Sequence, residues 1–276
     1  MSNGPVTPGK PQAWHEGINR YQWLVLTIAS AGWVFDVLEG QIFVASMRNA
    51  MPALLGGGAD HPSVRSWNDW AFGSFLLGGA FGGVLFGIIS DKIGRSRTMI
   101  ITILFYSLFT CVTAFAQHPW QMVVLRFFVA MGVGGEWAVA SAMVAEVMPD
   151  RSRPVMSSIF HASSVFGTLM AAAVGAFVVG NTDVLGPSAW RYGFAIGAAP
   201  ALLTLLVRWK LKDPEQAVKA RQRAGQAGGE QTGRLVELFQ GAQLRNTLVG
   251  VGLVSVGLVT LWGGHIYGKN ALLRRA

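Results

Sequence analysis

Long, uninterrupted apolar runs alternate with short polar segments along this chain. A hydrocarbon core of ~30 Å takes ~20 helical residues to cross. Because the apolar residues are continuous and do not alternate with polar ones, the pattern excludes the strands of a closed barrel. It predicts an all-α, multi-pass membrane protein with seven spans, at Trp23–Met47, Trp67–Ser90, Thr98–Ala116, Trp120–Met148, Ser157–Val179, Ala189–Trp209 and Thr247–Ile266.

The polar segments divide the chain into parts. A signal peptide is not expected, because the N-terminal residues are polar and the first apolar run is too long and lacks a small-residue cleavage site. The long hydrophilic segment after the sixth run contains Gly228-Gly229, which is typical of a flexible joint. We expect a cytoplasmic N-terminal segment at 1–22, a six-span bundle at 23–209, a central cytoplasmic loop at 210–246, a seventh span at 247–266 and a truncated tail at 267–276.

Positive charge is distributed unevenly between the two sides. With the N-terminus inside, 15 of the 22 lysines and arginines fall in the inner segments or at the inner ends of spans, and only Arg126 lies deep within a span. This asymmetry follows the positive-inside rule, so we expect a cytoplasmic N-terminus and a location in the inner or plasma membrane. The basic charge thus marks the cytoplasmic leaflet, and no nucleic-acid partner is needed to explain it.

Small residues recur every four positions on three of the predicted spans. Lipid offers no hydrophobic incentive for helices to associate, so small residues that let two backbones approach supply much of the packing. We expect structural seams between helices at Gly79, Gly83 and Gly87, at Gly134, Ala138 and Ala142, and at Ser163, Gly167, Ala171 and Gly175.

Charged residues inside the spans are the main candidates for function, because a charge at the bilayer centre costs at least ~2.5–3.5 kcal/mol. Asp36 lies ~20 Å into the first span, and Glu39 follows one turn further along the same face. Two carboxylates that close in low dielectric do not both stay ionised, so this pair is suited to carrying a proton. The alternative is that Glu39 reaches outward to the surface and only Asp36 is buried.

The fourth span carries further charges. Arg126 is followed by Gly-x-Gly-Gly-Glu-Trp, which ends in Glu136 and Trp137, and then by Glu146 and Arg153 in the pattern Glu-x-x-Pro-x-x-x-Arg. Ten residues turn a helix by ~1000°, about 80° short of three turns, so the arginine and the two acids do not share one face. A dinucleotide-binding loop is excluded, because that motif follows a strand and opens a water-exposed helix.

A compact charged loop joins the second and third runs. It contains Gly87, Asp91, Lys92, Gly94 and Arg95 in the order Gly-x-x-x-Asp-Lys-x-Gly-Arg. A basic loop with a capping glycine would explain the cations, but not an aspartate four residues after the first glycine. The pattern resembles the signature loop of the major facilitator superfamily, where it joins the second and third spans. The fourth-span pattern is similar to that of proton-coupled symporters in this family that carry organic acids, and more distantly to sugar porters.

The resemblance implies roles for these residues. Arg126 would recognise a substrate carboxylate, and Asp36 with Glu136 or Glu39 would carry the proton. The tryptophans Trp33 and Trp137 would line the site. The alternative is an ion pair between Arg126 and a carboxylate that only holds the bundle together.

A second set of residues would form a cytoplasmic gate. Glu146 lies at the inner end of the fourth span, where it can pair with Arg95 or Arg153. By resemblance it belongs, with Asp91, to a charge network that latches the inner gate.

Other residues point to no cofactor, metal site or enzyme. Cys111 is single and expected to be buried in the third span, so no disulfide framework is predicted. The five histidines do not have the spacing of metal ligands, and they are His15, His61, His118, His161 and His265. No arrangement of a nucleophile, a histidine and an acid is visible that would indicate an enzyme.

The reading is therefore the N-terminal half of a transporter whose partners are a small molecule, protons and the lipid bilayer. Members of the family have two six-span halves that rock against each other, so the missing C-terminal half or a second chain is a further expected partner. This chain alone is not expected to transport. The alternatives are a sugar or other neutral-metabolite porter, and a sensor or assembly partner that does not transport.

Overall fold

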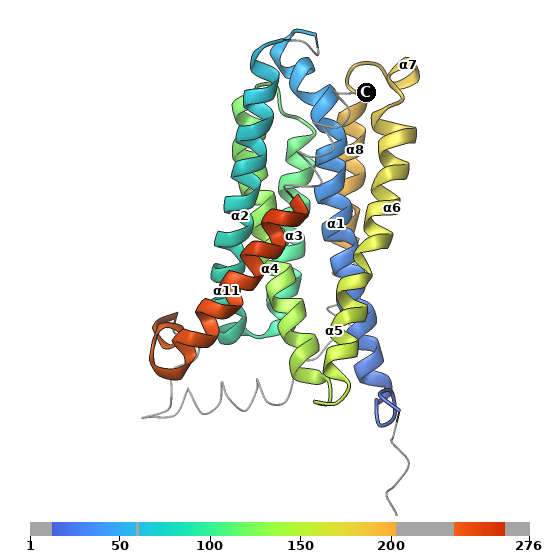
Figure 1. The fold of residues 1–276 in the computed structure, drawn as a ribbon. Helices are drawn as coiled ribbons and strands as arrows, with labels where there is room; N and C mark the ends of the chain where they lie inside the picture. Colours follow the sequence, from blue (N-terminus) through green and yellow to red (C-terminus); the bar gives the residue numbers. More distant parts are fainter. Residues whose placement is uncertain (1–12, 59–60, 203–234, 263–276) are drawn as a thin grey trace, which may run out of the picture. The chain divides into compact units, whose positions relative to one another are not determined.

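The computed structural model describes residues 13–58, 61–202 and 235–262, and its regular elements there are all helices (Figure 1). This confirms the expected all-α class. The first unit contains α1 (Arg20–Leu55), α2 (Ser63–Ile93), α3 (Arg95–Thr113), α4 (Pro119–Val147), α5 (Arg153–Ala162), α6 (Ser164–Val174), the π-helix η1 (Gly175–Val179), α7 (Thr182–Leu185), α8 (Ala189–Gly197) and the 3₁₀ helix η2 (Ala199–Leu202).

A second unit contains the 3₁₀ helix η3 (Leu235–Phe239) and α11 (Gly241–Trp262). The hydroxyl of Thr247 in α11 donates a hydrogen bond of 2.9 Å to the carbonyl oxygen of Leu238 in η3. This contact joins the short helix to the long one.

Five of the helical segments that the structure describes are long and apolar enough to cross a membrane, and they agree with the first five predicted spans to within a few residues, except that α1 extends eight residues beyond Met47. The sixth predicted span begins at Ala189, as α8 does, but its last residues, 203–209, lie outside the described residues. The seventh corresponds to α11, with 263–266 outside. Most of the predicted loop at 210–246 and all of the tail at 267–276 also lie outside, so these boundaries stay predictions.

Gly94 makes the sharp turn between α2 and α3. It is the one residue between Ile93 and Arg95, and its φ of 110° lies where a side chain is strained. Its amide donates to the carbonyl of Ser90, and its carbonyl accepts from the amide of Thr98. The backbone angle therefore requires the glycine of the predicted motif. The one-residue connection also keeps Asp91 close to Arg95.

Small-residue seams were expected on the second and fourth spans, and glycines bring α2 and α4 together, although the closest contacts lie one residue earlier in α2 than expected. A side chain at Gly78 or Gly82 would collide with carbonyl groups of α4, and one at Gly134 would collide with the carbonyl of Gly79. Gly87 has no heavy atom of another helix near the position of a Cβ, so it lies outside this seam. Backbone contact through glycine holds these two helices together.

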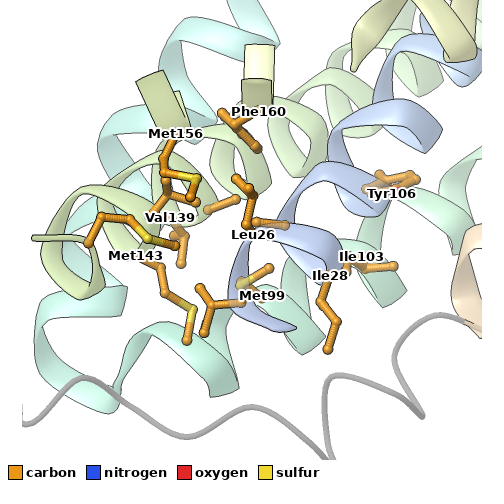
Figure 2. Close-up of a cluster of buried hydrophobic side chains, with 14 of the residues drawn as sticks. Leu26, Ile28, Met99, Ile103, Tyr106, Val139, Met143, Met156 and Phe160 are labelled. Atoms are coloured by element: carbon orange, nitrogen blue, oxygen red, sulfur yellow. The ribbon is translucent and has the colours of Figure 1, made fainter. Parts of the chain in front are cut away.

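The hydrophobic core lies where α1, α3, α4 and α5 meet (Figure 2). Its labelled side chains are fully or almost fully buried, at Leu26, Ile28, Met99, Ile103, Tyr106, Val139, Met143, Met156 and Phe160. The expectation that Cys111 is buried is wrong, because its side chain is exposed on the outer face of α3.

The fifth predicted span is one helix, Arg153–Val179, whose regular hydrogen bonding is interrupted near Ser163 and in the π-helical turn. Ser163 separates α5 from α6, and α6 runs directly into the π-helix η1. The Ser163 hydroxyl donates 2.6 Å to the carbonyl of Phe160, and the side-chain amide of Asn49 in α1 donates 2.9 Å to the carbonyl of Val179. Side chains therefore satisfy carbonyl groups that a regular helix would bond internally. Figure 1 shows this interrupted span lying along α1.

Candidate functional site

Arg126 of α4 forms a fully buried ion pair with Glu39 of α1. Its Nη1 atom lies 2.6 Å from Oε1 of Glu39, and both side chains are 0% exposed. The hydroxyl of Thr110 donates to the same carboxylate oxygen at 3.1 Å, and Nη2 of Arg126 donates to the Thr113 hydroxyl at 3.0 Å. Charged hydrogen bonds of this kind are shorter and stronger than neutral ones, so the arginine is held in one position.

Two aromatic rings hold the guanidinium group further. The Cζ atom of Arg126 lies 5.1 Å from the ring centre of Phe43 and 4.8 Å from that of Phe194. Such contacts stabilise a cation that has been removed from water. Nε of Arg126 and Oε2 of Glu39 nevertheless have no hydrogen-bond partner within the part of the chain that the structure describes.

Asp36 lies beside a different acid, Glu136 of α4, and beside Tyr106 of α3. Asp36 is 2% exposed, and the other two side chains are 0% exposed. None of their side-chain oxygens has a hydrogen-bond partner among the described residues. A Cβ atom at Gly32 would lie 2.5 Å from Oε1 of Glu136, so the glycine provides the space for this acid against α1.

The charged residues within the spans thus form two clusters, which differ from the expected arrangement. Glu39 pairs with Arg126, so the alternative in which it reaches outward is wrong. Asp36 lies against Glu136 and has Glu39 only as a more distant neighbour. The ion pair between Arg126 and a carboxylate that the alternative names is present, and its partner is Glu39.

Charge in this buried region is unbalanced. One guanidinium is present for three carboxyl groups, those of Asp36, Glu39 and Glu136. A buried carboxylate without a partner is costly, whereas a buried carboxylate paired with arginine is partly compensated. The arginine compensates one acid, so the Asp36–Glu136 pair is where added positive charge stabilises the bundle most.

Trp33 and Trp137 lie together, and both rings pack against a histidine. Their ring centres are 6.3 Å apart, and each lies within 6.3 Å of the imidazole ring of His161 in α5. The Trp33 indole N–H donates 3.2 Å to the backbone carbonyl of His161. Trp137 follows Glu136 in sequence, but a helix turns ~100° per residue, so the two side chains point in different directions.

At the end of the bundle where α2 meets α3, Arg95 joins three helices. Its Nη1 lies 2.8 Å from Oδ1 of Asp91 in α2, and its Nη2 lies 2.7 Å from Oε1 of Glu146 in α4. Nη1 also donates to the Ser90 hydroxyl. Of the two pairings open for Glu146, the structure has the one with Arg95.

The other residues of the predicted gate motif are not in this network. Arg153 pairs with Asp150 at 2.7 Å, and Lys92 is exposed. Gly87 contributes its carbonyl, which accepts a 2.8 Å hydrogen bond from the Ser90 hydroxyl. The charged core of the motif is therefore the set Asp91, Arg95 and Glu146.

Polar residues of the third span were not among the predicted site residues. Tyr106, Thr110 and Thr113 are fully buried and lie next to the charged clusters. Their spacing of four and three residues puts them on one face of α3. This helical spacing of polar positions in an apolar span was the signal that could have identified them.

Comparisons with known proteins agree with this architecture. The family model of the Major Facilitator Superfamily matches residues 42–268. The probable 4-methylmuconolactone transporter of Cupriavidus pinatubonensis is 31% identical over 211 residues, which cover 76% of this chain and 47% of that protein. The niacin transporter NiaP of Acinetobacter baylyi is 26% identical over 259 residues, covering 93% of this chain and 56% of that protein. The chain spans about half the length of the curated relatives that it matches.

Solved structures show the same fold. A crystal structure of a double-tryptophan mutant of XylE aligns with a TM-score of 0.67 at 18% identity, covering 91% of this chain and 63% of that one. The match extends over most of the predicted spans. Together with the family model and the relatives, it shows that this multi-pass chain belongs to the major facilitator superfamily, a family of membrane transporters and not of enzymes.

Proposed function

We propose that the protein takes part in proton-coupled symport of a small organic acid by alternating access. The observation that carries the proposal is the division of buried charge into an arginine that is already paired and an acid pair that lacks a cation. The names of two relatives, transporters of 4-methylmuconolactone and of niacin, support a small organic metabolite as the substrate.

Arg126 is the proposed contact for the substrate carboxylate. It presents a planar fork of N–H donors that fits a carboxylate in a bidentate geometry. In the present conformation Glu39 holds this group at 2.6 Å, and its Nε atom has no partner among the described residues. A substrate carboxylate would therefore compete with Glu39 for the guanidinium, which keeps the arginine compensated when the site is empty.

Asp36 and Glu136 are the proposed proton carriers. Both are buried, both lack a hydrogen-bond partner within the described residues, and the guanidinium is bound to a different acid. Neutralising one of them with a proton lowers the cost of closing the bundle around them. Proton binding is thereby linked to a conformational change, which is what symport needs.

Alternating access requires a second six-span unit, on the same polypeptide or on another chain, that rocks against this one. Asp91, Arg95 and Glu146 form the proposed latch of the inner gate, because they tie the α2–α3 turn to the end of α4. The proposed orientation puts this latch and the N-terminus in the cytoplasm of a cell with the protein in its plasma or inner membrane.

The proposal is tested in proteoliposomes that contain the protein with its second unit. Asp36→Asn is expected to abolish accumulation of a labelled acid driven by a pH gradient, while exchange of labelled for unlabelled acid continues. Exchange needs the binding site but no net movement of protons.

The control is Asp69→Asn, because Asp69 is an exposed acid of α2 in a loose pair with Arg65 at 3.9 Å. This variant is expected to accumulate the acid normally. Normal accumulation by Asp36→Asn would refute its role as a proton carrier. Uptake of neutral sugars in place of acids, or the absence of any flux, would instead support the porter or sensor alternatives.

A further inference from the structure

An aromatic cluster that the proposed proton and carboxylate sites do not use lies where α1, α4 and α5 meet. We define this aromatic cluster as Trp33 of α1, Trp137 of α4 and His161 of α5. The ring centres are 6.1 to 6.3 Å apart, which is within the range of edge and offset contacts between aromatic rings. Three helices therefore supply one ring each to a single surface.

Hydrogen bonds hold the residues of this cluster in place. α5 ends at Ala162, and the carbonyl of His161 accepts the Trp33 indole N–H at 3.2 Å. On the same turn, the Ser163 hydroxyl satisfies the carbonyl of Phe160 at 2.6 Å. Phe160 is fully buried and packs against the cluster, with its ring centre 6.2 Å from that of Trp33 and 4.8 Å from that of His161. A tryptophan locked in this way loses little freedom when a ligand binds.

His161 presents one free ring nitrogen on this surface. Its Nδ1 lies 2.8 Å from the carbonyl oxygen of Ser157, and a carbonyl can only accept, so Nδ1 carries the hydrogen. In the neutral imidazole, Nε2 is then an acceptor with its lone pair available. The side chain is exposed, and it lies eight residues after the start of α5 at Arg153, four residues inside the predicted span. A free imidazole acceptor facing hydrocarbon is costly, which indicates that this surface faces water and not lipid.

The cluster is adjacent to the proposed proton carriers but far from the proposed carboxylate contact. Trp33 precedes Asp36 by one turn of α1, and Trp137 directly follows Glu136 in α4. Along α4, Trp137 lies eleven residues from Arg126, which corresponds to ~16 Å at 1.5 Å per residue. A one-ring acid cannot span this distance, so ligands bind at the two positions one after the other.

We infer that Trp33, Trp137 and His161 form a second binding position for the substrate, and that it takes a planar ring that bears a hydrogen-bond donor such as a hydroxyl. The three rings are too close to admit a fourth between them. The ligand ring therefore lies on the open face of Trp137, which is 36% exposed, and its donor reaches Nε2 of His161. This inference rests on the proposed function, because it gives the transported acid a second station on its path.

The test measures equilibrium binding to the chain in lipid nanodiscs with two matched acids, benzoate and cyclohexanecarboxylate. The two have the same charge and ring size, but only benzoate is planar. An Arg126→Met background removes the proposed carboxylate contact. In that background, benzoate is expected to bind about 10-fold more tightly than cyclohexanecarboxylate, since stacking on an aromatic ring rewards a flat ligand.

Two variants locate the preference. Trp137→Leu is expected to reduce the 10-fold preference to about 2-fold or less, whereas Trp120→Leu, an exposed tryptophan at the other end of α4, leaves it unchanged. His161→Phe keeps a ring and removes the acceptor, so it is expected to abolish an advantage of about 5-fold for 3-hydroxybenzoate over benzoate. These comparisons use ligands on one folded protein, so a variant that fails to fold does not decide the outcome.

The outcomes separate this inference from the function on which it rests. Equal binding of benzoate and cyclohexanecarboxylate would overturn the aromatic position and leave the carboxylate contact intact. Complete loss of binding in an Arg126→Met chain that is shown to be folded by its circular dichroism, while the unmodified chain still binds both acids, would do the same. No binding of either acid to the unmodified chain would overturn both.

Discussion

Removing the negative charge of Glu39 is expected to destabilise the bundle strongly, because it leaves Arg126 buried without a counter-ion. The pair is 2.6 Å apart with both side chains 0% exposed. Breaking one side of a buried pair costs about 3–5 kcal/mol. In Glu39→Gln the arginine keeps its bond to Thr113 and its two aromatic neighbours, Phe43 and Phe194. We therefore expect a loss near the lower end, about 3 kcal/mol.

A double-mutant cycle separates the ion pair from simple packing. Glu39→Gln, Arg126→Met and the double variant are unfolded in mixed micelles of a mild detergent and a denaturing one, and the free energy of unfolding is compared. The double variant is expected to be more stable than Glu39→Gln, with a coupling energy of about 2 kcal/mol, because no unpaired charge remains.

The exposed pair Arg65–Asp69 provides the control. Its atoms are 3.9 Å apart, and its side chains are 72% and 51% exposed, so Asp69→Asn is expected to change stability by less than about 0.5 kcal/mol. Effects of Glu39→Gln and Arg126→Met that simply add would refute the electrostatic account. The arginine would then be held by packing alone.

Two further predictions concern the ends and seams of the bundle. Gly82→Ala pushes α2 away from the α4 backbone and is expected to lower stability by about 1–3 kcal/mol, whereas Gly87→Ala, with no neighbour to meet, is expected to unfold like the unmodified protein; equal stability of the two would contradict the glycine seam. Glu146→Gln removes the partner of Arg95 at 2.7 Å and is expected to lower the free energy of unfolding by about 1–2 kcal/mol, more than Asp91→Asn does. Because salt screens partly exposed charges, the loss caused by Glu146→Gln is expected to be smaller in about 0.5 M salt. A salt-independent loss in the same unfolding assay would argue against an ionic latch.

The spans were predictable because crossing a membrane sets both length and composition. The signature loop was predictable for a related reason: a one-residue turn at Gly94 brings Asp91, near the end of α2, close to Arg95 at the start of α3. The sequence could not predict that Glu146 pairs with Arg95 and not with Arg153, because both cations lie at the same end of the bundle. The choice depends on which face of α4 turns toward the α2–α3 turn.

For a similar reason, the sequence could not predict which residues of α4 contact the buried acids of α1. Asp36 and Glu39 are three residues apart, so their directions differ by ~60° around α1. That angle is small enough for the pattern to place them on one face, yet large enough to aim them at different residues of α4. Packing makes the choice for Glu136, because a Cβ at Gly32 would lie 2.5 Å from its Oε1, so only a glycine there leaves space for this acid against α1. Gly32 is not distinguishable from the other small residues of the chain until the helices are in place.

This geometry links the two charged clusters mechanically under the proposed function. Asp36 and Glu39 are carried by the same turn of α1, and their neighbours Glu136 and Arg126 are carried by α4. A rotation of α1 against α4 that separates Glu39 from Arg126, and so frees the guanidinium for a substrate, also moves Asp36 relative to Glu136. Binding of an acid at the first cluster and of a proton at the second would then favour the same relative position of two helices. Coupling of this kind needs no connecting chain of residues, because one rigid helix bears an acid of each cluster.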